Sequence, residues 1–254
     1  MRALAPLAVL SALTEEQQGL LDQLVEPQKV RYAGRDFWQG TLHGQPVVLA
    51  LSRIGKVAAA ITAAALIEHF GADRLVFTGV AGGVGPGVHV GDVVVGSGFI
   101  QHDMDASPLF PRYQIPLTGQ TVFPGDDRLT AQLLQACQEA LTGAARLGHR
   151  DEVHHQVHLG LIASGDRFVN GAREVASLVT ALQNAGHMPL AVEMEGAAVA
   201  QVCSDHGVAF AAVRTISDRA DDTAHVDFPQ FVSTVASVYA VKIIHRLLQL
   251  LSIK

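Results

Sequence analysis

Hydrophobic and polar residues alternate in two different patterns along this 254-residue chain. Short apolar runs bounded by glycine, proline or charged residues predict strands, and stretches in which apolar side chains recur every three or four positions predict helices. The predicted strands are residues 6–13, 30–32, 37–42, 47–51, 75–78, 92–100, 156–164, 190–194 and 208–216. The predicted helices are one that begins after Thr14, and residues 56–70, 129–147, 172–182, 196–206 and 228–251.

The order of these elements predicts the fold class. Strands alternate with helices, and a run of antiparallel strands lies near the start, so we expect one three-layer α/β/α sandwich with a mixed central sheet over residues 1–254. Thr14 is expected to cap the first helix, with Gln17 completing a capping-box pattern, and Pro27 to end it. The proline-rich segment between residues 100 and 127 is expected to be a loop. Ligands of such sheets bind at the carboxyl ends of the strands.

The composition narrows the class of partner. Hydrophobic residues make up 49% of the chain and the formal net charge is −6, so a folded protein without a nucleic-acid footprint is expected. No apolar run reaches the roughly 18 residues of a membrane helix, and the apolar start lacks the features of an export signal. The two cysteines, Cys137 and Cys203, form neither a disulfide scaffold nor a metal motif. We expect a cytoplasmic protein that binds a small molecule.

Four predicted strands end in acidic, glycine-rich or oppositely charged residues. Such residues could form a site, but each group also has a purely structural explanation. Glu15 and Glu16 suit the start of a helix, where acids favour the helix dipole. The glycine-rich residues 79–87 suit a tight turn, and they match neither a dinucleotide fingerprint nor a P-loop. Glu193 and Glu195 suit a capped helix, and residues 214–218 suit a buried Arg–Asp pair that holds loops. Together they would place several carboxylates and one arginine at one edge of the sheet. Such a site suits sugar hydroxyls, a water nucleophile and a developing cation better than phosphate.

These segments resemble, in order, the motifs of the nucleoside phosphorylase/nucleosidase superfamily, and above all its 5'-methylthioadenosine/S-adenosylhomocysteine nucleosidase branch. Residues 12–16 (Ala-Leu-Thr-Glu-Glu) are similar to Ala-Met-x-x-Glu, and residues 52–60 to Ser-Gly-Ile-Gly-Lys-Val-x-Ala-Ala. Five further matches follow at residues 78–83, 102–105, 164–170, 192–195 and 214–218. The resemblance covers nearly the whole chain.

The resemblance implies a hydrolase that cleaves the N-glycosidic bond of 5'-methylthioadenosine and S-adenosylhomocysteine, and of 5'-deoxyadenosine. By motif, Glu16 would activate water and Asp218 would protonate purine N7. The residues implied to bind substrate are Glu195 and Met194 at the ribose, Arg214 and Ser217 beside the acids, Phe168 and Val169 at the base, and Ile54, Val80 and Phe228 near the sugar and 5'-group. In this family a neighbouring subunit closes the 5' pocket, which implies a homodimer with Phe110 and Pro116 as the contributing residues. No cofactor and no metal are implied.

Three departures from the family pattern bear on the chemistry. Leu13 replaces a Met, Val80 stands where many members have Ser, and Arg53 replaces a Gly. Arg53 adds a cation beside the sugar loop, which raises the question of phosphate, because phosphorylase relatives bind phosphate with arginines. Against phosphate, Glu16 would repel the anion. Residues 147–158 exceed the family pattern, and no role is assigned to them.

Other functions remain open at this point. A phosphorylase on the same fold would differ only in its nucleophile, and an aminodeoxyfutalosine nucleosidase would share the motifs. A non-catalytic relative, such as the plant storage proteins of this fold, is disfavoured because Glu16, Glu195, Arg214 and Asp218 are all retained. His154, His155 and His158 resemble a metal patch, but a solvated loop is the preferred interpretation.

Overall fold

The computed structural model describes residues 4–144, 155–219 and 231–252. Its strands are β1 (Leu7–Ser11), β2 (Val25–Tyr32), β3 (Arg35–Leu42), β4 (Gln45–Leu51), β5 (Arg74–Gly83), β6 (Val93–Gln101), β7 (Val122–Pro124), β8 (Val157–Ser164), β9 (Pro189–Glu193) and β10 (Ala209–Asp218). Its helices are α1 (Thr14–Leu21), α2 (Lys56–Glu68), α3 (Asp127–Ala144), α4 (Ala172–Asn184), α5 (Gly196–His206), the π-helix η2 (Val232–Ala236) and α7 (Ser237–Ser252).

The strands form one mixed sheet in the order β10-β6-β8-β9-β5-β1-β4-β3-β2. Strand β10 also pairs with β5, in parallel, while its other neighbour β6 runs antiparallel to it. Strands β5, β10, β6, β8 and β9 therefore close on themselves, and the ring is completed where Gly82 and Gly83 of β5 pair with Val192 and Ala191 of β9. The carboxyl ends of β5, β8, β9 and β10 meet at this ring.

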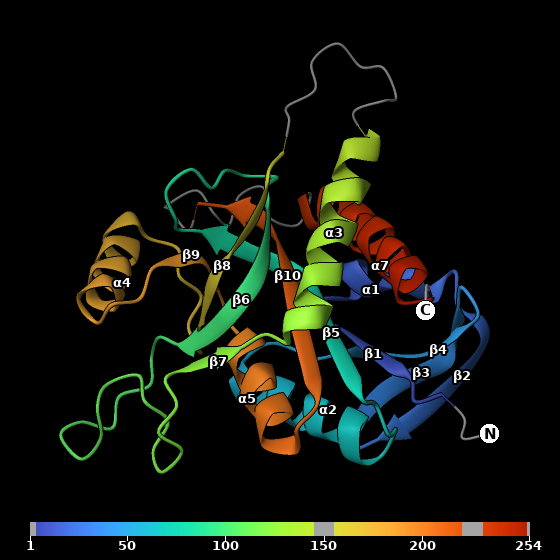
Figure 1. Cartoon of the computed structure of the whole chain (residues 1–254), viewed down its shortest axis with the longest axis horizontal. Coiled ribbons are helices and arrows are strands. Elements are labelled where there is room, and N and C mark those ends of the chain that lie inside the picture. Colours follow the sequence, from blue (N-terminus) through green and yellow to red (C-terminus); the bar gives the residue numbers. More distant parts are fainter. Residues whose placement is uncertain (1–3, 145–154, 220–230, 253–254) are drawn as a thin grey trace.

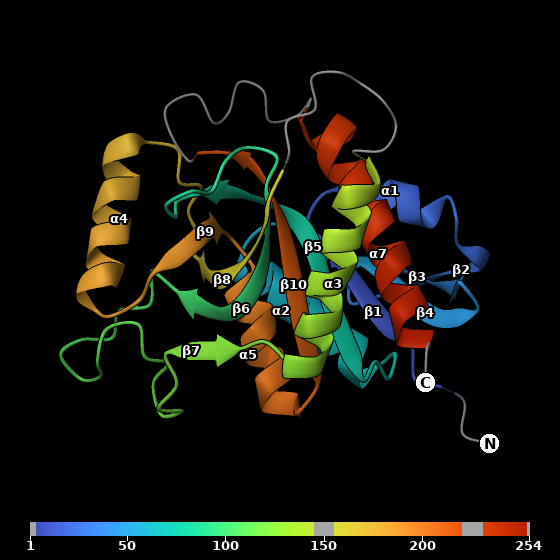
Figure 2. The ribbon, with the colours of Figure 1, turned by 45° about the horizontal axis from the view of Figure 1, so that its top comes forward.

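Helices cover both faces of the sheet, which confirms the three-layer sandwich (Figures 1 and 2). Helices α1, α3 and α7 pack together on one face, and α2 and α5 on the other. Strand β1 shows how the sequence achieves this, because its residues alternate between two cores. Leu7 and Val9 join the cluster of α3 and α7, whereas Ala8 and Leu10 join that of α2 and α5. Helix α4 lies at the end of the molecule beside β8 and β9 (Figure 1).

Several predicted boundaries need correction. Leu13, not Thr14, is the N-cap of α1, and no side chain of that residue caps the helix; instead the carboxylate of Glu16 turns back to the backbone amides that precede it. The helix ends at Leu21, and Pro27 lies within β2. The proline-rich segment contains the short strand β7, which pairs with β6. The predicted helix over residues 228–251 is interrupted by a π-helix before α7, and its first residues lie outside the described part.

One apolar helix bears on the expectation about membrane segments. The helix Val232–Ser252 is long and apolar enough to cross a membrane by length and composition. It belongs to the core of this fold, however, because its residues Ala240, Ile243, Ile244 and Leu247 form a buried stripe at helical spacing against α1 and α3. Packing within the domain accounts for its apolar character.

The two described histidines of the histidine-rich motif are less exposed than a solvated loop would make them. His158 and His155 are half-buried, and His158 Nε2 lies 2.9 Å from a carboxylate oxygen of the buried Asp92. Asp92 also accepts the Gln156 amide at 2.8 Å, so it joins the start of β8 to the turn before β6. His154 lies outside the described residues. In the part of the chain that the structure describes, no group of three or more His, Cys, Asp or Glu residues could hold a metal ion.

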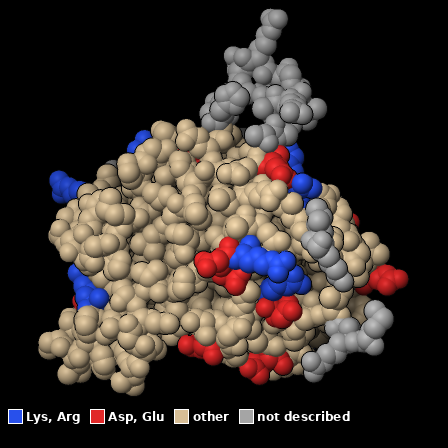
Figure 3. Space-filling model, in the orientation of Figure 1, with Lys and Arg blue, Asp and Glu red and all other residues tan. Residues whose placement is uncertain are grey.

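Charged side chains on the face seen in Figure 3 are scattered. Lysine and arginine there stand beside aspartate and glutamate, and the described residues of that face form no continuous basic patch. A nucleic-acid backbone would require such a patch.

Candidate active site

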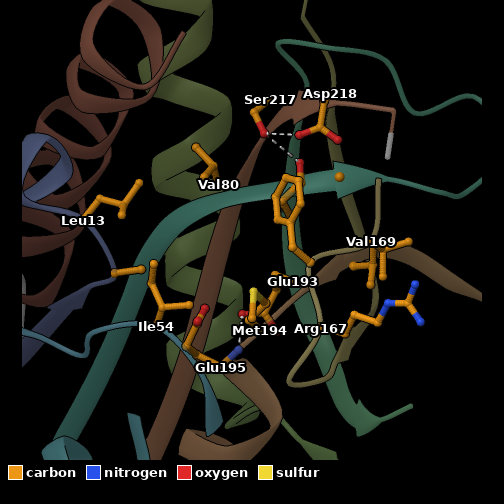
Figure 4. Close-up of a pocket in the computed structure, with 15 residues that line it drawn as sticks. Leu13, Ile54, Val80, Arg167, Val169, Glu193, Met194, Glu195, Ser217 and Asp218 are labelled. Atoms are coloured by element: carbon orange, nitrogen blue, oxygen red, sulfur yellow. Dashed lines mark hydrogen bonds between the residues drawn. The ribbon is translucent and has the colours of Figure 1, made fainter. Parts of the chain in front are cut away.

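One pocket opens at the carboxyl ends of strands β5, β9 and β10 of the closed ring, with a cavity volume of about 160 Å³. Residues from six separate segments line it: Ala12, Leu13, Ile54, Val80, Ala81, Gly82, Arg167, Phe168, Val169, Val192, Glu193, Met194, Glu195, Ser217 and Asp218. Ser217 and Asp218 lie across the pocket from Glu195, with Leu13 and Ile54 on one side and Arg167 and Val169 on the other (Figure 4).

Glu16 lies fully buried behind this pocket rather than on its surface. Its Oε2 accepts the backbone amides of Ala12 and Leu13, each at 3.0 Å. Its Oε1 is buried and has no hydrogen-bond partner among the described residues. Burial raises the pKa of Glu16, while the amide of Leu13 and the charge of Arg214 act in the opposite direction. The carboxyl group thus has one oxygen held by two backbone amides, and the other is buried beside the pocket wall.

Arg214 is held by a partner that the sequence did not identify. Its Nη2 lies 2.8 Å from Glu193 Oε2, and both side chains are almost completely buried. Its Nη1 donates to the carbonyl oxygens of Phe77 and Val213, and its guanidinium lies 4.0 Å from the centre of the Phe77 ring. The expected structural alternative, an Arg214–Asp218 pair, is not what the structure shows. Arg214 organises the acids behind the pocket.

Glu193 joins the end of β9 to the start of α5. Its carboxylate accepts the Glu195 amide at 3.1 Å and the Gly196 amide at 2.8 Å, and it is also hydrogen-bonded to the Ser164 hydroxyl. A carboxylate at the first amides of a helix is favoured by the helix dipole. Glu193 therefore fixes where the following acid, Glu195, enters the pocket.

Glu195 accepts the Gly55 amide at 2.8 Å and is 5% exposed. Burial, and after it the negative charge of Glu193, raises the pKa of Glu195 to about 8. Between pH 4.5, the ordinary pKa of this side chain, and about 8, Glu195 is protonated in the folded protein and ionised in the unfolded chain. The position of this carboxyl group, facing the pocket beside Met194, suits contact with the hydroxyls of a sugar.

The raised pKa of Glu195 has a consequence for stability. Between pH 4.5 and about 8, the folded state binds more protons than the unfolded state, so this group's contribution to the free energy of unfolding falls as the pH rises. The expected slope is up to about 1.4 kcal/mol per pH unit. Urea unfolding between pH 5 and 8 should show a shallower decline in Glu195→Gln, while Glu15→Gln, which changes an exposed acid, should follow the wild-type profile. Identical profiles for all three proteins would contradict the assignment.

Asp218 ends β10 on the opposite side of the pocket and is 8% exposed. The Ser217 hydroxyl donates to Asp218 Oδ2 at 2.7 Å, as Figure 4 shows. The pairing of β10 with β5 is irregular between Ile216 and Asp218. Because such an irregularity interrupts the alternation of a strand, Asp218 reaches the pocket although Arg214, four residues earlier, is buried behind it.

The remaining expected site residues fall into three groups. Those that line the pocket are Met194, Ser217, Phe168, Val169, Ile54 and Val80, and among them Ile54 and Phe168 are the most exposed. Phe110 and Pro116 are half-buried in the segment between β6 and β7 and do not line the pocket of this chain. Phe228, like the neighbouring His225, lies outside the described residues.

Arg53 does not enter the pocket. Its Nη2 donates to the Gly34 carbonyl at 2.6 Å, so the side chain is directed to the turn between β2 and β3. Its backbone has a φ of +63°, a conformation that favours glycine, the residue that the family pattern has here. The cation therefore completes no anion site beside Glu16.

Sequence reasoning missed several residues that the structure places at the site. Arg167 lines the pocket, and Ser164 and Gly55 bind Glu193 and Glu195 through a hydroxyl and a backbone amide. Arg167 and Ser164 lie in the segment 164–170, which matches the family pattern, so the sequence could have indicated that they lie near the site. The role of Gly55 could not, because it depends on a contact between residues 140 positions apart.

Comparisons with known proteins agree with this geometry. Residues 6–249 match the model of the phosphorylase superfamily. A 5'-methylthioadenosine/S-adenosylhomocysteine nucleosidase of Exiguobacterium is 35% identical over 93% of this chain and 94% of its own. The crystal structure of such a nucleosidase from Neisseria meningitidis, in complex with methylthio-immucillin-A, superposes with a TM-score of 0.84 at 34% identity, over 97% of this chain and 99% of that one.

A futalosine hydrolase of Helicobacter pylori is also similar, with a TM-score of 0.83 and 30% identity over 96% of this chain and 97% of that one. The family model and the relatives cover nearly the whole sequence. The chain belongs to the phosphorylase superfamily, in its 5'-methylthioadenosine/S-adenosylhomocysteine nucleosidase branch.

Proposed function

We propose that this protein hydrolyses the N-glycosidic bond of 5'-methylthioadenosine and S-adenosylhomocysteine, releasing adenine and the 5-thio-substituted ribose. The observation that carries the proposal is the arrangement of three acids, with Glu195 and Asp218 on opposite sides of one pocket and Glu16 buried behind its wall. The nucleosidases to which the chain is similar support the choice of substrate.

The chemistry follows from the poor leaving ability of an adenine anion. Asp218 gives a proton to purine N7, so that the electrons of the breaking C1'–N9 bond pass into a neutral base. The ribose then develops oxocarbenium character, which the surrounding carboxyl groups stabilise. A water molecule forms the new bond to C1', and its proton passes to Glu16. Glu195 binds the ribose hydroxyls, with Met194 against the sugar and Phe168 and Val169 at the base.

Product analysis tests this function. The purified protein is incubated with 5'-methylthioadenosine, S-adenosylhomocysteine or 5'-deoxyadenosine, and free adenine and reducing sugar are measured with and without inorganic phosphate. We expect adenine and an equimolar amount of reducing sugar without phosphate, and no 1-phosphate of the corresponding 5-modified ribose when phosphate is added. Release that requires phosphate would instead identify a phosphorylase.

Arg53 provides a specific test against the phosphorylase alternative. Because its guanidinium binds the Gly34 carbonyl and lies outside the pocket, Arg53→Gly is expected to keep hydrolysis within about twofold of wild type. Steady-state kinetics with and without phosphate measure this. A large loss of rate in the variant, or a phosphate effect that the variant abolishes, would place Arg53 in the site.

A second candidate, aminodeoxyfutalosine, is favoured by the similarity to the futalosine hydrolase. It differs from the thio-nucleosides only in the group beyond C5', on the side where Ile54 stands at the mouth of the pocket. Including it in the same assay compares the values of kcat/KM. We expect the thio-nucleosides to be preferred, since the nucleosidases share the higher identity.

We further propose a cytoplasmic homodimer. Large apolar side chains are exposed at the pocket mouth, on the neighbouring helix α2 and on the β6–β7 segment: Ile54, Val57, Ile61, Leu109 and Leu117. Phe110 and Pro116 lie in the same segment, and a second subunit would cover these groups. Sedimentation equilibrium should give twice the 26.9 kDa chain mass, and Leu109→Glu with Leu117→Glu should shift the protein to monomer. A wild-type monomer at micromolar concentration would contradict the proposal.

A further inference from the structure

A closed set of hydrogen bonds lies just outside the pocket, among three charged residues from three separate segments. Lys56 Nζ donates to Asp103 Oδ1 at 2.6 Å, and the Asp166 backbone amide donates to Asp103 Oδ2 at 2.9 Å. The Lys56 backbone amide in turn donates to Asp166 Oδ1 at 2.7 Å. Each residue of the set thus contacts the other two.

The set connects two segments that line the pocket. Lys56 follows Ile54 and Gly55, and the Gly55 amide is the donor to Glu195. Asp166 precedes Arg167, Phe168 and Val169. Asp103 lies just after β6 and is not among the residues that line the pocket. The three residues therefore join the sugar side of the pocket to the side implied to hold the base.

The neighbours of the set fix it to the sheet. Lys56 Nζ also donates to Gln101 Oε1 at 3.0 Å, and Gln101 donates to Gln201 on α5. Next to Asp103, the ring of His102 packs so closely on Gly165 that a side chain at that position would overlap it. The His102 amide donates to the Ser164 carbonyl at 2.9 Å. The segment that begins at Gly165 is thus held on two sides by residues that follow β6.

Asp166 is exposed, but the charges of Lys56 and Asp103 are partly shielded from water. The side chains of Lys56 and Asp103 are 15% and 32% exposed. Burial opposes the ionisation of Asp103, but the Lys56 ammonium and the Asp166 amide outweigh it and hold the pKa of Asp103 below its ordinary value. A charge-assisted pair in such surroundings is stronger than an exposed one.

We propose that Lys56, Asp103 and Asp166 form a positioning latch that holds the base-side segment 165–169 against the sugar-side segment 52–55. The proposal rests on the proposed function for its effect on substrate. The hydrogen bonds of the latch involve neither Glu16 nor Asp218, so it serves the binding of the nucleoside rather than the cleavage of its bond. Loss of such uniform binding raises KM with little change in kcat.

The test compares Lys56→Met, Asp103→Ala and the double variant with a matched surface pair. Lys29 and Asp36 form an ion pair at 2.8 Å on β2 and β3, and Lys29→Met and Asp36→Ala are the controls. We expect each latch variant to raise KM about tenfold with kcat within about threefold, the double variant to resemble the single ones, and Lys56→Arg to recover most of the affinity. The controls should leave both constants unchanged.

Hydrogen–deuterium exchange gives a measurement that does not depend on activity. The Asp166 amide loses its acceptor in Asp103→Ala, so exchange at residues 165–169 should become at least about tenfold faster, while α3 and α7 remain protected. Unchanged exchange in this segment would overturn the latch, and faster exchange with an unchanged KM would overturn its role in binding. If wild-type protein releases no adenine, the proposed function fails, and exchange alone decides whether the latch joins the two segments.

Discussion

Glu16→Gln and Asp218→Asn are each expected to lower kcat by about 10²-fold or more, with the fold preserved. Both changes keep the shape of the side chain. In Glu16→Gln the new amide oxygen can still accept the Ala12 and Leu13 amides, and in Asp218→Asn the amide oxygen can still accept the Ser217 hydroxyl. What each variant loses is the ability to take up or deliver a proton.

Two matched variants control for the loss of negative charge. Glu15, which precedes Glu16 on α1, and Asp205 on α5 are exposed acids, and Glu15→Gln and Asp205→Asn should retain full turnover. The two catalytic variants should also differ from each other. With a riboside whose leaving group needs no proton, such as p-nitrophenolate, Asp218→Asn should recover much of its rate and Glu16→Gln should not. Near-normal release of adenine by either variant would remove that residue from the mechanism.

Arg214→Met should be the most destabilising of the substitutions considered, by about 3–5 kcal/mol. The side chains of Arg214 and Glu193 are 2% and 3% exposed, so the change leaves a buried carboxylate without its partner. Glu193→Gln alone should also destabilise the protein, because it leaves the arginine charge uncompensated. The double variant should lose less than the sum of the two, since the charges disappear together.

The surface pair of Arg246 and Glu139 is the control for this prediction. Its side chains are 36% and 39% exposed, and Arg246→Met is expected to cost no more than about 1 kcal/mol. Urea unfolding followed by circular dichroism measures all four variants. A cost for Arg214→Met as small as that for Arg246→Met would show that water or another group reaches Glu193, and the organising role of the pair would be wrong.

Most of the fold could be predicted because its signals are local. Strands β1, β5 and β10 are apolar runs that end in polar residues or glycine. In the helical segments, apolar residues recur every three or four positions. Strand β7 was missed because its three residues stand among prolines and their pairing with β6 depends on tertiary contacts. The closure of the ring has no local signal, since it consists of two residue pairs between β5 and β9.

The sequence predicted which residues form the site better than it predicted which of them pair with each other. Three acids at strand ends indicated a common edge, and Glu195 and Asp218 indeed share a pocket. The sequence could not show that Arg214 pairs with Glu193 rather than Asp218, because the irregularity before Asp218 changes which face of β10 that residue occupies. It also could not show that the backbone turns Arg53 away from the sugar side.

The ring of β5, β10, β6, β8 and β9 makes the spacing of the acids a property of the scaffold. A strand with a partner on both sides cannot slide by one residue without breaking two ladders, and such a slip would turn Glu193 or Arg214 to the opposite face. Loops that leave the ring are free of this constraint. An engineer who wishes to change which 5'-group is accepted can therefore vary Ile54, which stands exposed at the mouth of the pocket outside the ring, and leave the hydrolytic geometry unaltered.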